Sequence, residues 1–129
     1  LFGWWRYLRA GYNSVKGNLP RIGPLQHNPA DYDLVVLGTP IWTSYPCLPM
    51  RALLDARPDM PDRIAGFITY GGQSEPDKAF DMMAEMLGKP ITSRLAIQNE
   101  DGKLPDMDAK AKAFASVCCG DVRTASSDG

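Results

Sequence analysis

Leu34-Val35-Val36-Leu37-Gly38 is the clearest strand signal in this chain of 129 residues. The run is apolar and β-branched, and it does not alternate with polar residues. A strand of this kind is usually covered on both faces, as in a parallel sheet. The sequence therefore predicts a strand here that is buried on both sides.

Helices and further strands follow this run in regular order. A helical pattern is expected from Leu48 to Arg57, where Pro58 ends it. Residues 64–70 predict a second apolar strand, and a weaker third strand covers residues 92–98. Strand, loop and helix in repetition predict parallel βαβ units with helices on both faces of the sheet. The fold class is therefore α/β.

Two of the expected helices have distinct ends and inner sides. In the helix after the second strand, Ser74 is expected as the N-cap, with Asp77 three residues further on. The buried side of this helix is expected to contain Phe80, Met83 and Leu87, and Gly88 followed by Pro90 is expected to end it. Asp106 is expected to cap a last helix that runs to about Cys118. Its inner side comprises Met107, Ala111, Phe114 and Val117 or Cys118. Residues 120–129 are expected to form a frayed tail.

The first residues differ from the rest in charge and pattern. Residues 1–21 carry four basic side chains and no acid, and apolar residues recur there at helical spacing, namely Leu1, Trp5, Leu8, Tyr12 and Val15. This pattern fits an amphipathic helix that docks on a membrane or a partner. It also fits a short helix that folds its aromatic side onto the domain, which is the interpretation we favour. Residues 17–32 are expected to form an irregular connection.

Charge, hydropathy and cysteine spacing argue against nucleic-acid binding, a transmembrane segment and a disulfide framework. Lys and Arg number 14 against 15 Asp and Glu, so the net charge of -1 provides no field for a nucleic-acid backbone. No apolar run is long enough for a transmembrane segment. The three cysteines, Cys47, Cys118 and Cys119, have no disulfide or zinc spacing, which indicates a reducing compartment, and we expect the cytoplasm.

Several common catalytic and nucleotide motifs are missing from the sequence. His27 is the only histidine and lies in the proline-rich connection, so a Ser-His-Asp or Cys-His site has no well-placed base. There is no dinucleotide G-x-G-x-x-G after a strand and no P-loop G-x-x-x-x-G-K-[ST]. We therefore expect no catalytic acid, base or metal ligand.

The loops after the two best strands remain as candidate binding elements, because ligands of open parallel sheets lie outside the carboxyl ends of the strands. The first loop, residues 39–46, contains the aromatic residues Trp42 and Tyr45. The second places Tyr70 before two glycines, where a ligand could reach backbone N–H groups. Aromatic planes with exposed amides suit a flat heteroaromatic ligand. Alternatively, the aromatic residues cap the core and the glycines only turn the chain.

The stretch Asp31-Tyr32-Asp33-Leu34-Val35-Val36-Leu37-Gly38-Thr39-Pro40-Ile41-Trp42, together with Ile68-Thr69-Tyr70-Gly71-Gly72 and the helix from Phe80 to Gly88, resembles the flavodoxin family. The resemblance covers about residues 31–119. It implies an open parallel sheet of order 2-1-3-4-5, whose third to fifth strands are the visible ones. It also implies FMN as cofactor, bound by Thr39, Pro40, Ile41, Trp42, Thr43 and Tyr45 on one side of the ring and by Tyr70, Gly71 and Gly72 on the other.

The resemblance implies a flavoprotein in electron transfer or in NAD(P)H-linked redox chemistry with an unknown redox partner. The family's phosphate loop and its first two strands are not found before residue 31. We therefore expect an N-terminally incomplete single domain, comprising residues 1–30 as segment and connection, 31–119 as βα units and 120–129 as tail. Such a domain would bind FMN weakly and could form a homodimer through an exposed sheet edge.

A rival hypothesis needs no cofactor. In it, the chain is an α/β interaction module that docks on a membrane or a protein through its aromatic, basic first segment, with Trp4, Trp5, Arg6 and Arg9. Deletion of residues 1–16 would separate the two hypotheses. The rival predicts that binding to the partner is lost, whereas a flavin site at the strand ends would survive.

Overall fold

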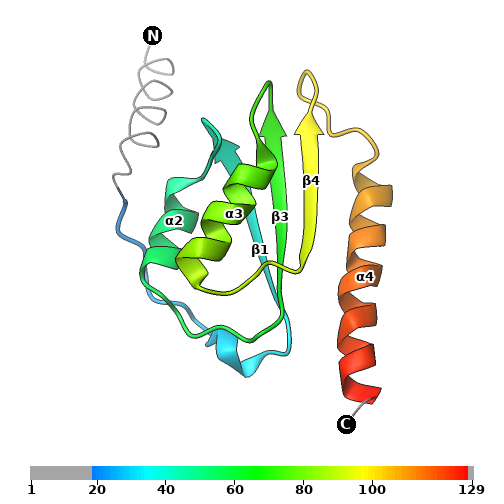
Figure 1. Cartoon of the computed structure of the whole chain (residues 1–129). Coiled ribbons are helices and arrows are strands. Elements are labelled where there is room, and N and C mark those ends of the chain that lie inside the picture. The colour runs from blue at the N-terminus through cyan, green and yellow to red at the C-terminus, as the bar shows by residue number, and fades with distance from the viewer. Residues whose placement is uncertain (1–18, 128–129) are drawn as a thin grey trace.

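The computed structural model describes residues 19–127, and it confirms the α/β fold class (Figure 1). Four strands form one sheet in the order β2-β1-β3-β4. The strands are β1 (Val35–Trp42), β2 (Tyr45–Pro46), β3 (Ile64–Gly71) and β4 (Ser93–Asn99). The helices are α2 (Leu48–Asp55), α3 (Pro76–Leu87) and α4 (Met107–Ser127), and a short 3-10 turn, η1 (Pro29–Asp31), precedes β1.

The three expected strands pair in parallel, as the βαβ pattern predicts. β1 and β3 pair from Val35↔Ile64 onward, and β3 and β4 pair from Ala65↔Ser93 onward. The two-residue strand β2 was not predicted. It pairs antiparallel with the end of β1, at Ile41↔Pro46. The sheet is therefore mixed, with one short hairpin at the carboxyl end of β1.

Helices α2 and α3 cover one face of the sheet, which we call the closed face (Figure 1). Its core contains the fully buried side chains of Leu54, Ile64, Ile68, Phe80 and Met83. This confirms the inner side expected for α3 at Phe80 and Met83. Phe80 packs so closely on β3 that a Cβ on Gly66 would lie 2.6 Å from the Phe80 ring. The glycine is therefore required by the close approach of helix and strand.

The opposite face, which we call the open face, is less covered. Along β1, Leu37 is buried on the closed face, whereas Val36 is 50% exposed and Gly38 and Pro40 are also exposed. The prediction that this strand is buried on both sides is therefore wrong. The reason is that α2 and α3 share one face, and α4 contacts β4 rather than β1. Burial here depends on where the helices lie, not on the apolar character of the strand.

The helix ends differ from those expected. Helix α2 ends at Asp55 with Ala56 as its C-cap, two residues before the expected Arg57. The N-cap of α3 is Glu75 rather than Ser74, and no side chain caps this end. A proline in the first turn needs no N–H acceptor and has a helical φ, so Pro76 begins the helix in place of a capping box. Gly88 ends α3 in the left-handed conformation, as expected.

Helix α4 is longer than predicted. It continues to Ser127, so the expectation of a frayed tail is wrong for residues 120–127. No proline interrupts this stretch, and a single glycine at position 120 costs only about 1 kcal/mol in a helix. Cys118 is buried and Phe114 partly buried, whereas Met107 and Val117 are exposed, so the expected inner side is only partly right. Within residues 19–127, no helix is long and apolar enough to cross a membrane.

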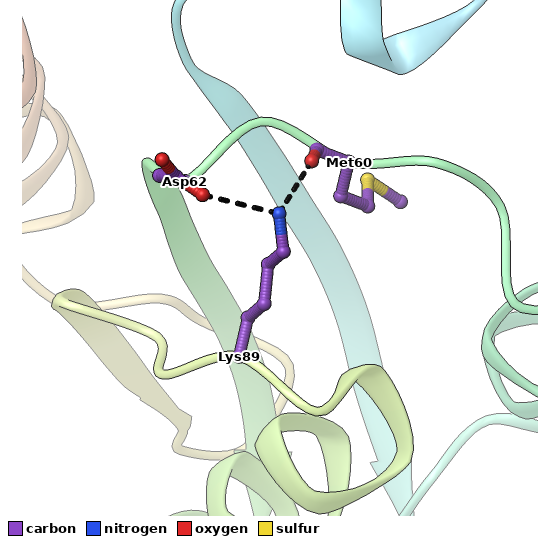
Figure 2. Close-up of polar contacts among 3 residues, drawn as sticks. All are labelled: Met60, Asp62 and Lys89. Atoms are coloured by element: carbon purple, nitrogen blue, oxygen red, sulfur yellow. Dashed lines mark hydrogen bonds and ion pairs between the residues drawn. The ribbon is translucent and has the colours of Figure 1, made fainter.

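One lysine ties together two connections at the amino end of the sheet (Figure 2). The Nζ of Lys89, which follows α3, donates to the carbonyl oxygen of Met60 at 2.7 Å and pairs with Oδ1 of Asp62 at 3.2 Å. Met60 and Asp62 lie in the connection from α2 to β3, and the Met60 side chain belongs to the core of the closed face. The lysine thus holds this connection in place beside the core.

Candidate functional site

The two candidate loops lie at the same edge of the sheet. β1 and β3 are neighbouring parallel strands, and Pro40 pairs with Thr69 near their carboxyl ends. The first loop is the turn between β1 and β2, and the second leads from β3 into α3 (Figure 1). This edge is where open parallel sheets bind ligands. The structure therefore brings together the loop residues expected from the sequence.

The first loop is a tight hairpin turn in an uncommon conformation. Thr43 and Ser44 both have positive φ, 53° and 67°. Two left-handed residues between antiparallel strands form the type I′ geometry, which asparagine and glycine normally occupy. For a β-branched residue such as Thr43 this backbone is strained. Such strain persists only where the surroundings hold it, and it occurs preferentially at ligand sites and switches.

A buried hydroxyl fixes the base of this hairpin. Thr39 is 3% exposed, and its Oγ1 accepts a hydrogen bond from the backbone N–H of Cys47 at 3.1 Å. The hydroxyl hydrogen can be donated to Pro40 O at 2.8 Å or to Cys47 Sγ at 3.2 Å. Thr39 therefore joins the end of β1 to the start of α2. Its side chain is engaged in the interior and its backbone pairs with β3, so Thr39 positions the loop and offers no free polar group to a ligand.

The Tyr45 ring contacts two cations. The guanidinium carbon of Arg51 lies 5.4 Å from the centre of the tyrosine ring, and Lys78 Nζ lies 5.5 Å from it. These distances are those of cation–π contacts. Arg51 belongs to α2 and Lys78 to the first turns of α3. The hairpin is thus tied to both helices of the closed face through this one ring.

The second loop has no covering side chains. Gly71 and Gly72 are exposed, and a Cβ at either position would meet nothing within 4 Å. Gly72 has φ +60, so the turn itself requires a glycine here. Tyr70, just before them, packs against the core of the closed face. The backbone of the glycine pair is therefore open to a ligand, while the tyrosine ring faces inward.

Sequence reasoning missed the residue that braces the second loop. Gln98, near the end of β4, pairs in register with Tyr70 and donates from Nε2 to the Gly72 carbonyl oxygen at 3.2 Å. A polar residue at the end of the third parallel strand, beside the glycine loop, was the available signal. Gln98 therefore fixes the Gly72 carbonyl, while the backbone N–H of Ser74 donates to the Gly71 carbonyl oxygen at 3.4 Å.

The other predicted residues of the first loop, Pro40, Ile41 and Trp42, differ in their surroundings. Pro40 is exposed on the open face of β1, and Ile41 is buried in the core of the closed face. Trp42 ends β1, and its side chain lies outside the described part, as does the whole segment 1–18. No group of three or more His, Cys, Asp or Glu side chains among the described residues is arranged to hold a metal ion. The described site is therefore a surface of backbone and small residues.

Two cavities lie away from these loops. One, of about 370 Å³, lies between β4 and α4, and the other, of about 230 Å³, is lined by Leu34, Arg63, Thr92, Ser93 and Cys118. Neither includes a predicted site residue. Both lie by the start of β4, whereas the candidate loops follow the ends of the strands.

Comparison with known proteins supports the fold. No family model matches the sequence, and no curated protein matches it. Among solved structures, a flavoprotein in complex with FMN from Lactobacillus acidophilus NCFM is similar, with a TM-score of 0.54 at 20% sequence identity. The match covers 81% of this chain and 65% of the flavoprotein, so this chain spans less than two thirds of its length. At this identity the likeness concerns the fold.

Proposed function

We propose that this chain binds the ring of FMN between the hairpin after β1 and the glycine loop after β3, and that it serves electron transfer or NAD(P)H-linked redox chemistry. One observation carries the proposal: the exposed pair Gly71 and Gly72 lies on the strand next to the strained Thr43–Ser44 hairpin, at the carboxyl edge of parallel strands. The fold shared with a flavoprotein that contains FMN supports it.

The chain's own residues would bind and orient the flat ring. The backbone N–H of Gly71 would donate to the polar edge of the ring, because no side chain at Gly71 or Gly72 stands before it. On the other side, Thr39 and Tyr45 would keep the hairpin in position, so that the backbone from Pro40 to Thr43 forms a fixed wall. FMN would supply the redox chemistry. No side chain acts as acid or base in this proposal.

A fluorescence titration tests the proposal. Flavin fluorescence would be followed as purified protein is added, and quenching that saturates is expected. Gly72→Val should abolish it, because the new side chain occupies the space in front of the loop. The matched control is Gly102→Val. Gly102 is also exposed, has φ +79 and has no neighbour near a Cβ, so it bears the same backbone strain outside the site.

Comparison of FMN with riboflavin refines the test. The chain offers ring contacts but no recognisable phosphate loop, so we expect the two flavins to bind with similar affinity. Affinity for FMN far above that for riboflavin would reveal a phosphate site elsewhere in the chain, since charge-assisted hydrogen bonds to a phosphate contribute about 1.5–3 kcal/mol each. Absence of quenching by the unmodified protein, or equal loss in both valine variants, would overturn the proposed site.

The redox role has its own measurement. Protein loaded with FMN would be mixed with NADPH or NADH without oxygen, and bleaching of the flavin absorbance followed. Bleaching by a nicotinamide nucleotide faster than that of free FMN indicates an NAD(P)H-linked reaction. Bleaching by dithionite alone indicates an electron carrier. Dithionite reduction is the control that shows the bound flavin to be competent.

A further inference from the structure

The cavity between β4 and α4 lies apart from the carboxyl-edge loops. It has a volume of about 370 Å³, and it is lined by residues 92–95 at the start of the strand and by Lys110, Ala113, Phe114 and Val117 of the helix. Figure 1 shows α4 alongside β4, the strand that it contacts. Because every lining residue lies between positions 92 and 117, the cavity does not depend on the chain before β1.

The walls of this cavity are largely apolar. Leu95 and Phe114 are partly buried, and Val117 is 54% exposed, which is unusual for a large apolar side chain on a helix that packs against a sheet. Ala113 contributes only a methyl group, so it leaves the space between strand and helix open. The cavity therefore offers an apolar surface that solvent can reach.

Lys110 and Ser93 supply the polar side-chain groups that are available in the cavity. Within residues 19–127, no carboxylate pairs with the Lys110 ammonium, and the Ser93 hydroxyl makes no hydrogen bond. The other polar side chains are engaged: Arg94 pairs with Asp81 at 3.1 Å, and the Thr92 hydroxyl donates to the start of β3 at 3.3 Å. The available groups are thus one cation and one hydroxyl, and both can donate hydrogen bonds.

The backbone of β4 adds donors beside the same cavity. The N–H of Thr92 donates to the Ile64 carbonyl oxygen at 3.0 Å, so the alternation along a strand points the N–H groups of Ser93 and Leu95 away from β3. β4 is the outer strand of the sheet. It is also the outer strand in the order 2-1-3-4-5 that the resemblance to flavodoxins implies, so that order places no further strand on this edge.

We propose that this cavity binds a small amphipathic carboxylate, a molecule with an apolar body and one carboxylate group. The body lies among Leu95, Phe114 and Val117, and the carboxylate accepts from Lys110 Nζ and from the Ser93 hydroxyl. Apolar walls with a few converging polar groups, at this volume, are typical of small-molecule sites.

The polar groups select the charge of the ligand. No lining residue is acidic, so nothing in the cavity repels an anion. The single ammonium of Lys110 balances the one negative charge of a carboxylate, and charge-assisted hydrogen bonds are stronger than neutral ones. The site shares no residue with the proposed flavin site, and it would stand whether or not the chain binds a flavin.

A nuclear magnetic resonance titration of isotope-labelled protein with octanoate, below the concentration at which it forms micelles, tests the site. We expect saturable shift changes confined to the backbone amides of residues 92–95 and 110–117. Octanamide has a similar shape without the charge, and it should bind about threefold or more weakly than octanoate. Acetate has the charge without the apolar body, and it should cause no saturable change.

Two pairs of variants locate the head group and the body. Lys110→Gln should weaken octanoate binding about threefold or more and leave octanamide binding unchanged, because it removes only the charge. Lys112→Gln, an exposed lysine of the same helix outside the cavity, is the matched control. Ala113→Trp should abolish binding of both ligands, because the indole occupies the space. Ala115→Trp, exposed on α4 outside the cavity, should not.

The outcomes separate the proposal from its alternatives. Losses in Lys110→Gln and Ala113→Trp, with both controls unchanged and circular dichroism showing all variants folded, support it. Equal affinity for octanamide and octanoate, or an unchanged affinity in Lys110→Gln, overturns the charged head group and with it the proposal. Absence of octanoate binding, or shift changes outside residues 92–95 and 110–117 that persist in Ala113→Trp, overturns the site itself.

Discussion

The two faces of the β1–β3 pair are built from similarly apolar strands but end in different environments. On the closed face, Phe80 and Met83 pack against Ile64 and Ile68 without exposure. On the open face, Val36 is exposed within a run that looks equally apolar in the sequence. The difference arises from the crossover helices, which put α2 and α3 on one side. An apolar strand therefore predicts a sheet, but it does not predict how many faces are covered.

The largest expected difference in stability between the two faces is at two phenylalanines. Phe80→Ala should lower the free energy of unfolding by about 3–5 kcal/mol, because the ring is buried among packed side chains. Phe67→Ala, on the open face, should lower it by less than half as much, since Phe67 is only partly buried. Urea unfolding followed by circular dichroism measures both. Equal losses would mean that the open face is covered in solution.

Two glycines on opposite faces provide the second test. Gly66→Ala should destabilise by about 1–3 kcal/mol, because the new methyl would overlap the Phe80 ring. Gly38→Ala should raise the free energy of unfolding, by less than about 1 kcal/mol. The new methyl would contact only one atom of the Phe67 ring, at an ordinary distance, and alanine lowers the conformational entropy of the unfolded chain. Thermal melts of the two variants are compared. A reversed order would contradict the assignment of faces.

The third test concerns what holds the amino end of the closed face. Lys89→Met should cost about 1 kcal/mol, because it removes the hydrogen bond to the Met60 carbonyl. Asp62→Asn removes only an ion pair whose carboxylate is fully exposed, and we expect stability to change little. Chemical unfolding of the two variants separates the hydrogen bond from the ion pair. Equal effects would show that the ion pair contributes as much as the carbonyl contact.

The smallest effect is expected at the open face itself. Val36→Thr replaces a half-exposed methyl group with a hydroxyl of similar shape, so the free energy of unfolding should stay within about 0.5 kcal/mol. Urea unfolding followed by circular dichroism measures the change. A loss well above this value would place Val36 in a covered environment within a single chain.

Much of the fold follows from local patterns. The apolar runs identify all three long strands, and the spacing of Phe80 and Met83 identifies the inner side of α3. Two features were not predicted. One is the exposure of Val36, which depends on which face the helices cover and so on contacts distant in sequence. The other is the continuation of α4 to Ser127, in a stretch with no breaker but weak periodicity.

The candidate site was predictable in its location but not in its geometry. Both loops follow the strands as expected, because the carboxyl ends of parallel strands share an edge. The left-handed backbone of Thr43 and Ser44 was not predicted, since neither residue favours it. Tyr45 also gave no sequence signal for its cation contacts, because Lys78 belongs to a helix more than thirty residues away. Pairings of this kind exist only in the folded chain.

The β1–β2 hairpin has a kinetic consequence. Ile41 pairs with Pro46, five positions along the chain, whereas Val35 pairs with Ile64, twenty-nine positions away. Closing a short loop costs less chain entropy than closing a long one, and hairpins form in about 1–10 μs. The hairpin wall of the candidate site therefore needs only local contacts to close. The opposite wall, at Gly71 and Gly72, is expected to form later, because it requires β3 to pair with β1 across a longer stretch of chain.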